Sequence, residues 1–329
     1  MEFGLFLMGA DFNTVRASAR EAEELGYDLV VFPDHFVHLQ PGGNYDPHTL
    51  AHESILLAAA AADATRKIRI GHLVLCNLFR HPALAAQSLM SLDHLSGGRA
   101  VAGFGAGWTK VEFDMTGIEF PAIATRLRML DESLTCVRSL WTRERTTFAG
   151  EFYHLQDAIL WPKPIQQPHP PIIIGGAGKG ALRLAAKHAD VINLGLHSGK
   201  VATLTMEAMR ELTGDVVRER AAFVRAEAAR AGRDPEAITI GTSIFSVSLA
   251  QSAAAAEASA RAIGEMIGVT PRDAVRSPLF LIGTPEQCIE ELRRRVREWG
   301  VGQITFMAET IEIMRRLAKE ILPQVKVSL

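Results

Sequence analysis

Cysteine is scarce in this chain, and no long apolar run occurs among its 329 residues. The three cysteines, Cys76, Cys136 and Cys288, are widely spaced and form no C-x-x-C pair. This excludes a disulfide framework and predicts reduced, mostly buried thiols of an intracellular protein. No run of about 18 apolar residues is present to span a bilayer, and the acidic N-terminus has too short an apolar run for a signal peptide. We therefore expect a cytoplasmic protein without a membrane partner.

The chain also lacks an excess of charge of either sign, because 35 Lys and Arg residues are balanced by 37 Asp and Glu residues and the formal net charge is -2. Such a balance gives no global reason to expect nucleic acid as a partner. Hydrophobic residues make up 48% of the chain, which is enough for a sizeable core and excludes the disordered class.

Eight short apolar runs alternate with segments of helical periodicity, and this pattern predicts strands followed by helices. A doubly wound sheet would also alternate in this way, but eight units favour a closed (β/α)8 TIM barrel. We expect one domain over residues 1–329, since no linker or shift of composition divides the chain. The predicted strands are 2–8, 28–33, 68–75, 100–105, 172–175, 191–194, 238–245 and 303–307.

Helix boundaries are marked most clearly near the two ends of the chain. Asn13 is the expected N-cap of a helix that reaches Leu25 and stops at Gly26. Thr284 and Gln287 form a capping box around Pro285. Two segments interrupt the rhythm, after strand four (residues 142–171, with a predicted hairpin) and after strand seven (residues 246–280). We expect these insertions to act as lids or interface elements.

The glycine-rich stretch 174–180, IGGAGKG, resembles a phosphate loop. A Walker A motif fails, because its first glycine would fall at Ile173 and Gly180 lacks the required hydroxyl; a dinucleotide fingerprint would need its third glycine at Ala181. Two interpretations stay open, a backbone cradle for a phosphate at a helix start and a tight strand-to-helix turn. The stretch 103–108, GFGAGW, likewise allows close approach of a flat ring or simply tight packing.

Asp34 and His35 form the sharpest polar pair, since they follow the second predicted strand. In a barrel, the C-terminal strand ends carry the chemistry, and a histidine there can exchange a proton near neutral pH. Asn77 and Trp108 follow neighbouring strands and are expected to shape the same mouth. Lys200 is either an anion contact at the sixth strand or a solvated lysine.

Other polar groups favour ordinary structural roles. His48 and His52 would share a helix face beside Glu53, but metal ligands in such barrels normally sit on strand ends, so no metal is predicted. The basic run 293–297 alternates with apolar positions and is expected to be a solvated helix face.

Taken in order, four segments resemble the luciferase-like monooxygenase superfamily of flavin- and deazaflavin-dependent barrels, and they span essentially the whole chain. They are EELGYDLVVFPDHF, IRIGHLVLCNLFRHPALAAQSLMSLDHLSGGRAVAGFGAGW, PKPIQQPHPPIIIGGAGKGALRLAAKHAD and LIGTPEQCIEEL.

The resemblance implies one redox cofactor across the barrel mouth, FMN or the deazaflavin coenzyme F420. The run Pro33-Asp34-His35-Phe36 is similar to the F420-dependent branch, and FMN is the alternative. A cis peptide bond is expected at Leu73–Val74, behind the ring. The residues implied to bind the cofactor are Asp34, His35, Leu73, Val74, Asn77, Gly105, Gly107, Gly175, Gly176, Ala177, Gly178 and Lys179.

Sugar-phosphate dehydrogenases of that branch carry Ser-Gly-Lys after strand six, as Ser198-Gly199-Lys200 does here, but also a catalytic glutamate where this chain has Trp108. Trp108 and Lys200 are therefore expected to bind substrate, in a more apolar pocket.

Our hypothesis is an F420-dependent oxidoreductase that transfers hydride to or from a small organic substrate, with His35 as acid, base or hydrogen-bond partner and Asp34 as its orienting or ring-contacting neighbour. The alternatives are an FMN-dependent monooxygenase, a metal-dependent barrel hydrolase and a non-catalytic flavin-binding protein. Relatives of this kind are commonly homodimers, and the apolar helix at 54–64 is a candidate interface.

Overall fold

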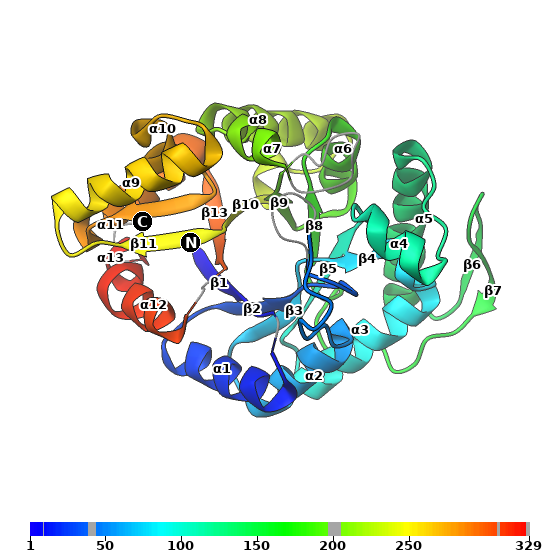
Figure 1. Cartoon of the computed structure of the whole chain (residues 1–329). Helices are drawn as coiled ribbons and strands as arrows, with labels where there is room; N and C mark the ends of the chain where they lie inside the picture. The colour runs from blue at the N-terminus through cyan, green and yellow to red at the C-terminus, as the bar shows by residue number, and fades with distance from the viewer. Residues whose placement is uncertain (9, 39–43, 197–204, 308–309, 327–329) are drawn as a thin grey trace.

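The fold is a parallel β-barrel surrounded by helices (Figure 1). A computed structural model describes residues 1–8, 10–38, 44–196, 205–307 and 310–326. Within these ranges, each barrel strand pairs in parallel with its neighbours, and β3 pairs with β5 to close the ring. The barrel strands are β1 (Glu2–Phe6), β2 (Leu29–Phe32), β3 (Arg69–His72), β5 (Ala100–Gly105), β8 (Ile172–Gly176), β9 (Val191–Leu194), β10 (Thr239–Ile244) and β13 (Val301–Phe306).

Helices follow the strands in the order that the sequence predicts. The short strand β4 (Leu75–Cys76) and a 3₁₀ turn (Asn77–Phe79) continue the third unit. The helices of the outer layer are α1 (Phe12–Glu24), α2 (Ser54–Ala64), α3 (Pro82–Ser96), α4 (Lys110–Thr116), α5 (Ile123–Thr142), α6 (Lys179–His188), α7 (Met206–Glu211), α8 (Gly214–Arg230), α11 (Pro285–Trp299), α12 (Ile311–Arg316) and α13 (Leu322–Lys326).

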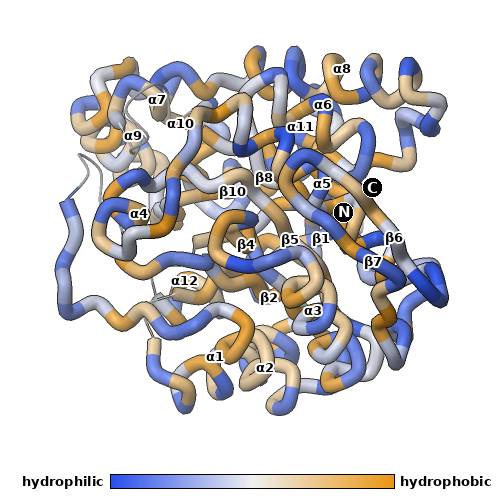
Figure 2. The backbone as a smooth tube through the Cα atoms, turned by 90° about the vertical axis from the view of Figure 1, so that its right-hand side faces the viewer, coloured by the Kyte–Doolittle hydropathy of each residue, from blue (hydrophilic) through white to orange (hydrophobic). Residues whose placement is uncertain are grey.

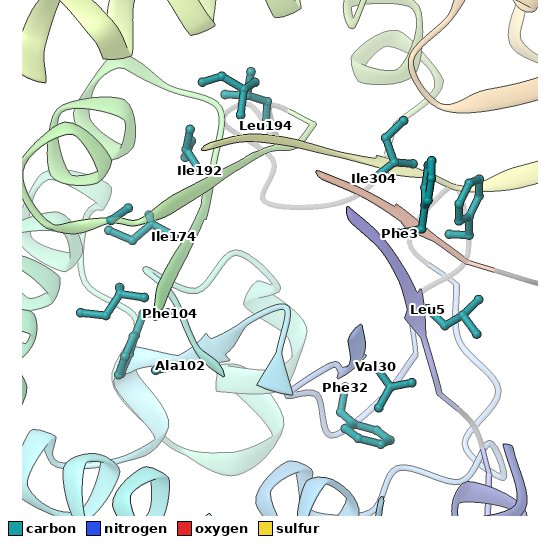
Figure 3. Packing of buried hydrophobic residues seen from close by; sticks show 14 of the residues in the cluster. Phe3, Leu5, Val30, Phe32, Ala102, Phe104, Ile174, Ile192, Leu194 and Ile304 are labelled. Carbon is teal, nitrogen blue, oxygen red and sulfur yellow. The ribbon is translucent and has the colours of Figure 1, made fainter. Parts of the chain in front are cut away.

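Alternate residues of each strand face opposite sides of the barrel wall, as the two-residue period of a strand requires. Residues such as Phe3, Phe104 and Ile304 point outward to the helices and form the main core (Figure 3). The opposite faces fill the barrel with a second, smaller cluster around Val31 and Val101. In Figure 2 hydrophilic and hydrophobic residues alternate along the turns of α8, which buries one face only.

The predicted helix ends are partly right. The capping box of α11 is present, and α11 ends at Gly300 in the left-handed conformation. At α1 the N-cap is Asp11 rather than Asn13, because the Asp11 carboxylate accepts the backbone N–H groups of Asn13 and Thr14. A carboxylate is also favoured at a helix N-terminus by the helix dipole. None of the helices that the structure describes combines the length and apolar character of a bilayer crossing.

Both predicted insertions are found. The hairpin joins β6 (Thr146–Ala149) to β7 (His154–Ala158) and lies outside the ring, beyond α5 (Figure 1). The second insertion runs through β11 (Ser246–Leu249), α9 (Ala253–Ile267), α10 (Pro271–Arg276) and β12 (Phe280–Gly283), and β11 pairs with β12.

The basic run on α11 contradicts the expected solvated face at one position. Arg295 is fully buried; its guanidinium donates to the carbonyl oxygens of Ser277, Pro278 and Phe280 and pairs with Glu291. These carbonyls lie in the stretch from the end of α10 to the first residue of β12 and need donors once the helices cover them. The second insertion is therefore fastened to α11 by a buried arginine.

Burial of His72 makes stability depend on pH. This histidine on β3 is fully buried, Nε2 lies 3.3 Å from the carbonyl oxygen of Ser54, and burial lowers the pKa of His72 to about 4. The unfolded chain binds this proton near pH 6.5, so stability is present above that pH and is lost as the pH falls toward 4. The loss amounts to about 3 kcal/mol.

The variant His72→Gln keeps a donor for Ser54 but does not titrate. We expect the difference between its unfolding free energies at pH 7 and pH 4.5 to be smaller than in the wild type by about 2–3 kcal/mol, measured by urea denaturation. The exposed His48, replaced in the same way, serves as the control. Equal pH slopes in all three proteins would contradict the assignment.

Candidate active site

A cavity of about 1050 Å³ opens at the C-terminal ends of the barrel strands, where barrels of this kind carry their sites. This volume is at the upper end for small-molecule sites and is large enough for a cofactor ring with a substrate beside it. Of the residues that the sequence analysis singled out, the cavity is lined by Asp34, His35, Leu73, Val74, Gly105, Gly107, Trp108, Gly175, Gly176, Ala177 and Gly178.

His35 is held by a carboxylate that the sequence analysis missed. Nδ1 of His35 lies 2.9 Å from Oε2 of Glu112, whose side chain is only 2% exposed. The other oxygen, Oε1, accepts the backbone N–H groups of Phe36 (2.5 Å) and Val37 (3.2 Å). A carboxylate with these donors fixes the imidazole with its proton on Nδ1, which leaves Nε2 free as an acceptor.

Asp34 lines the cavity but does not orient His35, and its predicted contact with a cofactor ring stays a prediction. Its buried carboxylate forms a bidentate ion pair with Arg80 (2.6 and 2.9 Å) and accepts the backbone N–H of Cys76 at 2.8 Å. Arg80 also pairs with Glu53 at the surface. The carboxylate that orients His35 is thus Glu112, and Asp34 ties the end of β2 to β4.

Trp108 and Cys76 also line the cavity. Trp108 meets the imidazole edge to face, with ring centroids 5.7 Å apart. Burial raises the pKa of the Cys76 thiol to about 12, so it is not a thiolate nucleophile near neutral pH. Cys76 is therefore not a candidate for proton exchange, whereas an oriented imidazole such as that of His35 is.

The peptide bond between Leu73 and Val74 is cis, as expected. A Cβ atom added at Gly105 would lie 2.6 Å from the side chain of Val74, and one at Gly175 would lie 3.3 Å from it. These two glycines therefore leave room for Val74. On β5, glycine thus serves close packing of protein groups. Leu73 and Val74 form an apolar part of the cavity wall.

The glycine-rich loop enters α6 without a side-chain cap. Its N-cap is Gly178, which has no side chain to accept the first N–H groups of the helix. Gly175, Gly176 and Ala177 line the cavity. Free N–H groups at a helix start that face a cavity are suited to a phosphate. Lys179 is exposed and does not line the cavity, so the cradle would consist of backbone alone.

The other predicted site residues lie elsewhere. Asn77 is buried and donates to the hydroxyl of Tyr153 (3.4 Å) outside the cavity lining. Lys200 lies outside the described residues. His48 and His52 precede α2 and are not on a helix. In the part of the chain that the structure describes, no group of three or more His, Cys, Asp or Glu side chains is arranged to hold a metal ion.

The walls also differ from expectation. None of residues 142–171 lines the cavity, whereas Leu279 of the second insertion does, and an interface role for the hairpin stays a prediction. The wall next to His35 is formed by α4, the loop after it and the start of α5. In this wall Arg126 donates a hydrogen bond to the carbonyl oxygen of Pro121, and its guanidinium stacks on the ring of Phe120. One signal for Glu112 was available in the sequence: a carboxylate one helical turn after Trp108.

Comparison with known proteins now places the chain in a family. The sequence profile of the luciferase-like monooxygenase family matches residues 1–266. The chain belongs to this family. Solved structures at low identity share its barrel fold.

Among its relatives are an F420-dependent glucose-6-phosphate dehydrogenase of Amycolatopsis mediterranei, 35% identical over 173 residues (52% of this chain, 50% of the relative), and an FMNH(2)-dependent dimethylsulfone monooxygenase of Pseudomonas putida, 32% identical over 180 residues (55% and 47%). The chain spans about half the length of these curated relatives. The relatives of this chain thus include F420-dependent and FMNH(2)-dependent enzymes.

Two solved structures have the same fold over nearly the whole chain. An F420-dependent secondary alcohol dehydrogenase, solved with an F420–acetone adduct, is 22% identical with a TM-score of 0.78 and covers 98% of both chains. A monooxygenase from Streptomyces bottropensis is 24% identical with a TM-score of 0.76, covering 98% of this chain and 99% of its own.

Proposed function

We propose that the protein is an oxidoreductase that binds coenzyme F420 in the cavity and transfers a hydride between it and a small organic substrate. The observation that carries the proposal is the Glu112–His35 pair at the edge of a cavity of about 1050 Å³. Cavity size, an apolar surface and an oriented imidazole are the features that a hydride-transfer site needs from its protein.

The residues on the cavity wall fit such a cofactor. Leu73 and Val74 offer an apolar surface to one face of a ring, and the loop from Gly175 to Gly178 offers backbone N–H groups to a phosphate. When bound, the deazaflavin supplies a carbon centre that donates or accepts a hydride. The protein has to hold ring and substrate against each other and exclude water.

The accompanying proton is assigned to His35. With Nδ1–H directed to Glu112, Nε2 can accept a proton from a substrate hydroxyl or return one to a carbonyl oxygen. Glu112 is a positioning residue that stabilises the imidazolium formed in that exchange. Trp108 packs against the ring of His35 and makes this corner more apolar, which supports a substrate less polar than a sugar phosphate.

The preference for F420 over FMN rests on two observations. Asp34-His35-Phe36 is similar to the F420-dependent branch, and relatives at 35–36% identity include F420-dependent glucose-6-phosphate dehydrogenases of Amycolatopsis mediterranei and Microbacterium testaceum. FMN is the second candidate, because the dimethylsulfone monooxygenase of Pseudomonas putida is 32% identical.

The test is a titration of the purified protein, freed of cofactor, with F420 and with FMN, followed by the fluorescence of each cofactor. We expect F420 to bind at least tenfold more tightly than FMN. Tighter binding of FMN would overturn the choice of cofactor, and binding of neither would overturn the proposed function.

A further inference from the structure

A buried amide on β9 faces the cavity with its donor unused. Asn193 lines the cavity and is 5% exposed. Its Oδ1 accepts a hydrogen bond from Oγ of Ser243 on β10, at 3.2 Å. Its Nδ2 has no partner among the described residues. Because the serine hydroxyl occupies the oxygen, the amide is oriented with its N–H groups directed elsewhere.

One strand neighbour of Asn193 is a glycine, at which a side chain would otherwise contact that nitrogen. In the sheet register Asn193 is opposite Gly175 on β8 and Gly241 on β10. A Cβ atom at Gly241 would lie 3.5 Å from Nδ2, so a side chain there would cover the amide. Gly241 therefore places no side chain over Nδ2, whereas a side chain at Gly175 would meet Val74 instead.

Asn193 stands across the mouth from His35. In the ring order, β9 is the fourth strand from β2 in either direction, through β1, β13 and β10 or through β3, β5 and β8. In an eight-stranded barrel the fourth strand is the opposite one. A molecule that reaches from the imidazole across the cavity therefore meets this amide.

We propose that Asn193 is a ligand-binding residue, which donates a hydrogen bond from Nδ2 to an acceptor oxygen of a molecule held in the cavity, with Ser243 as its positioning residue. A buried polar group without a partner is costly, and a ligand oxygen removes that cost on binding. The oxygen belongs to a hydroxyl or carbonyl group of the cofactor or of the organic substrate. The inference rests on the proposed function in taking this cavity as the place where both bind.

The test compares Asn193→Leu with the wild type, since leucine keeps the volume and removes the donor. Thr242→Val is the matched control: Thr242 is on neighbouring β10, is buried and does not line the cavity, and its Oγ1 has no partner in the described part of the chain. One arm measures the dissociation constants of F420 and FMN by fluorescence. The other measures, at saturating cofactor, binding of acetone and cyclohexanone through the change in cofactor absorbance.

We expect Asn193→Leu to weaken binding about five- to tenfold in one arm, as loss of one hydrogen bond implies, and Thr242→Val to bind as the wild type does. A loss confined to the first arm assigns the oxygen to the cofactor, and one confined to the second assigns it to the substrate. Equal affinities of wild type and Asn193→Leu in both arms overturn the inference. Failure of the proposed function appears differently, as a wild type that binds neither cofactor, and that result overturns both.

Discussion

Replacing Glu112 by glutamine is expected to lower kcat by about 10²- to 10⁴-fold, the range typical for loss of general acid–base catalysis. Glutamine keeps the shape of the side chain, and its carbonyl oxygen can still accept the N–H of Phe36. Its amide group then faces Nδ1 of His35 and donates to it, so the proton of the imidazole moves to Nε2. The nitrogen that faces the substrate becomes a donor and no longer accepts a proton.

The tautomer provides a readout that a merely structural role would not move. In ¹⁵N spectra of the imidazole we expect the proton on Nδ1 in the wild type and on Nε2 in Glu112→Gln. The pH dependence of turnover should change with it, and the double variant Glu112→Gln/His35→Gln should be no slower than His35→Gln alone. An unchanged tautomer together with unchanged turnover would contradict the role of Glu112.

The largest expected effect on stability comes from Arg295→Met, which should lower the free energy of unfolding by about 3–5 kcal/mol. Methionine fills similar volume but removes the guanidinium donor from the carbonyl oxygens of Ser277, Pro278 and Phe280. It also removes one of the cations that face the mostly buried carboxylate of Glu291. Chemical denaturation monitored by circular dichroism measures the change.

Arg297→Met is the matched control on the same helix. Arg297 is 57% exposed and pairs with Glu290 at the surface, where an ion pair contributes about 1 kcal/mol or less. If both variants lost the same amount of stability, Arg295 would not be the group that holds the second insertion.

Local patterns accounted for most of the fold. The eight barrel strands lie where apolar runs were found, and the hairpin and the capping box around Thr284 are confirmed. These features depend on residues within one or two turns of each other, so the sequence carries them directly. The N-cap of α1 was placed two residues late because Asp11 and Asn13 are both good capping residues, and only geometry selects between them.

The site was predicted less completely. Position after a strand was enough to bring Asp34, His35 and Trp108 to one cavity, but it did not say which groups would meet there. The distance between His35 and Glu112 is 77 positions in the chain, and that between Asp34 and Arg80 is 46. Asn77 and Lys179 follow strands as well, yet one turns to Tyr153 and the other to solvent.

By itself, then, the sequence determined the barrel and the family, because strand and helix periods and the glycine-rich turns are local properties of the chain. Only the tertiary structure decided the partners of the polar side chains: Glu112 with His35, Asp34 with Arg80, and Arg295 with backbone carbonyls that the sequence pattern did not predict. Side-chain partners depend on how separate strand ends and helices meet in space, and burial then makes each pairing obligatory.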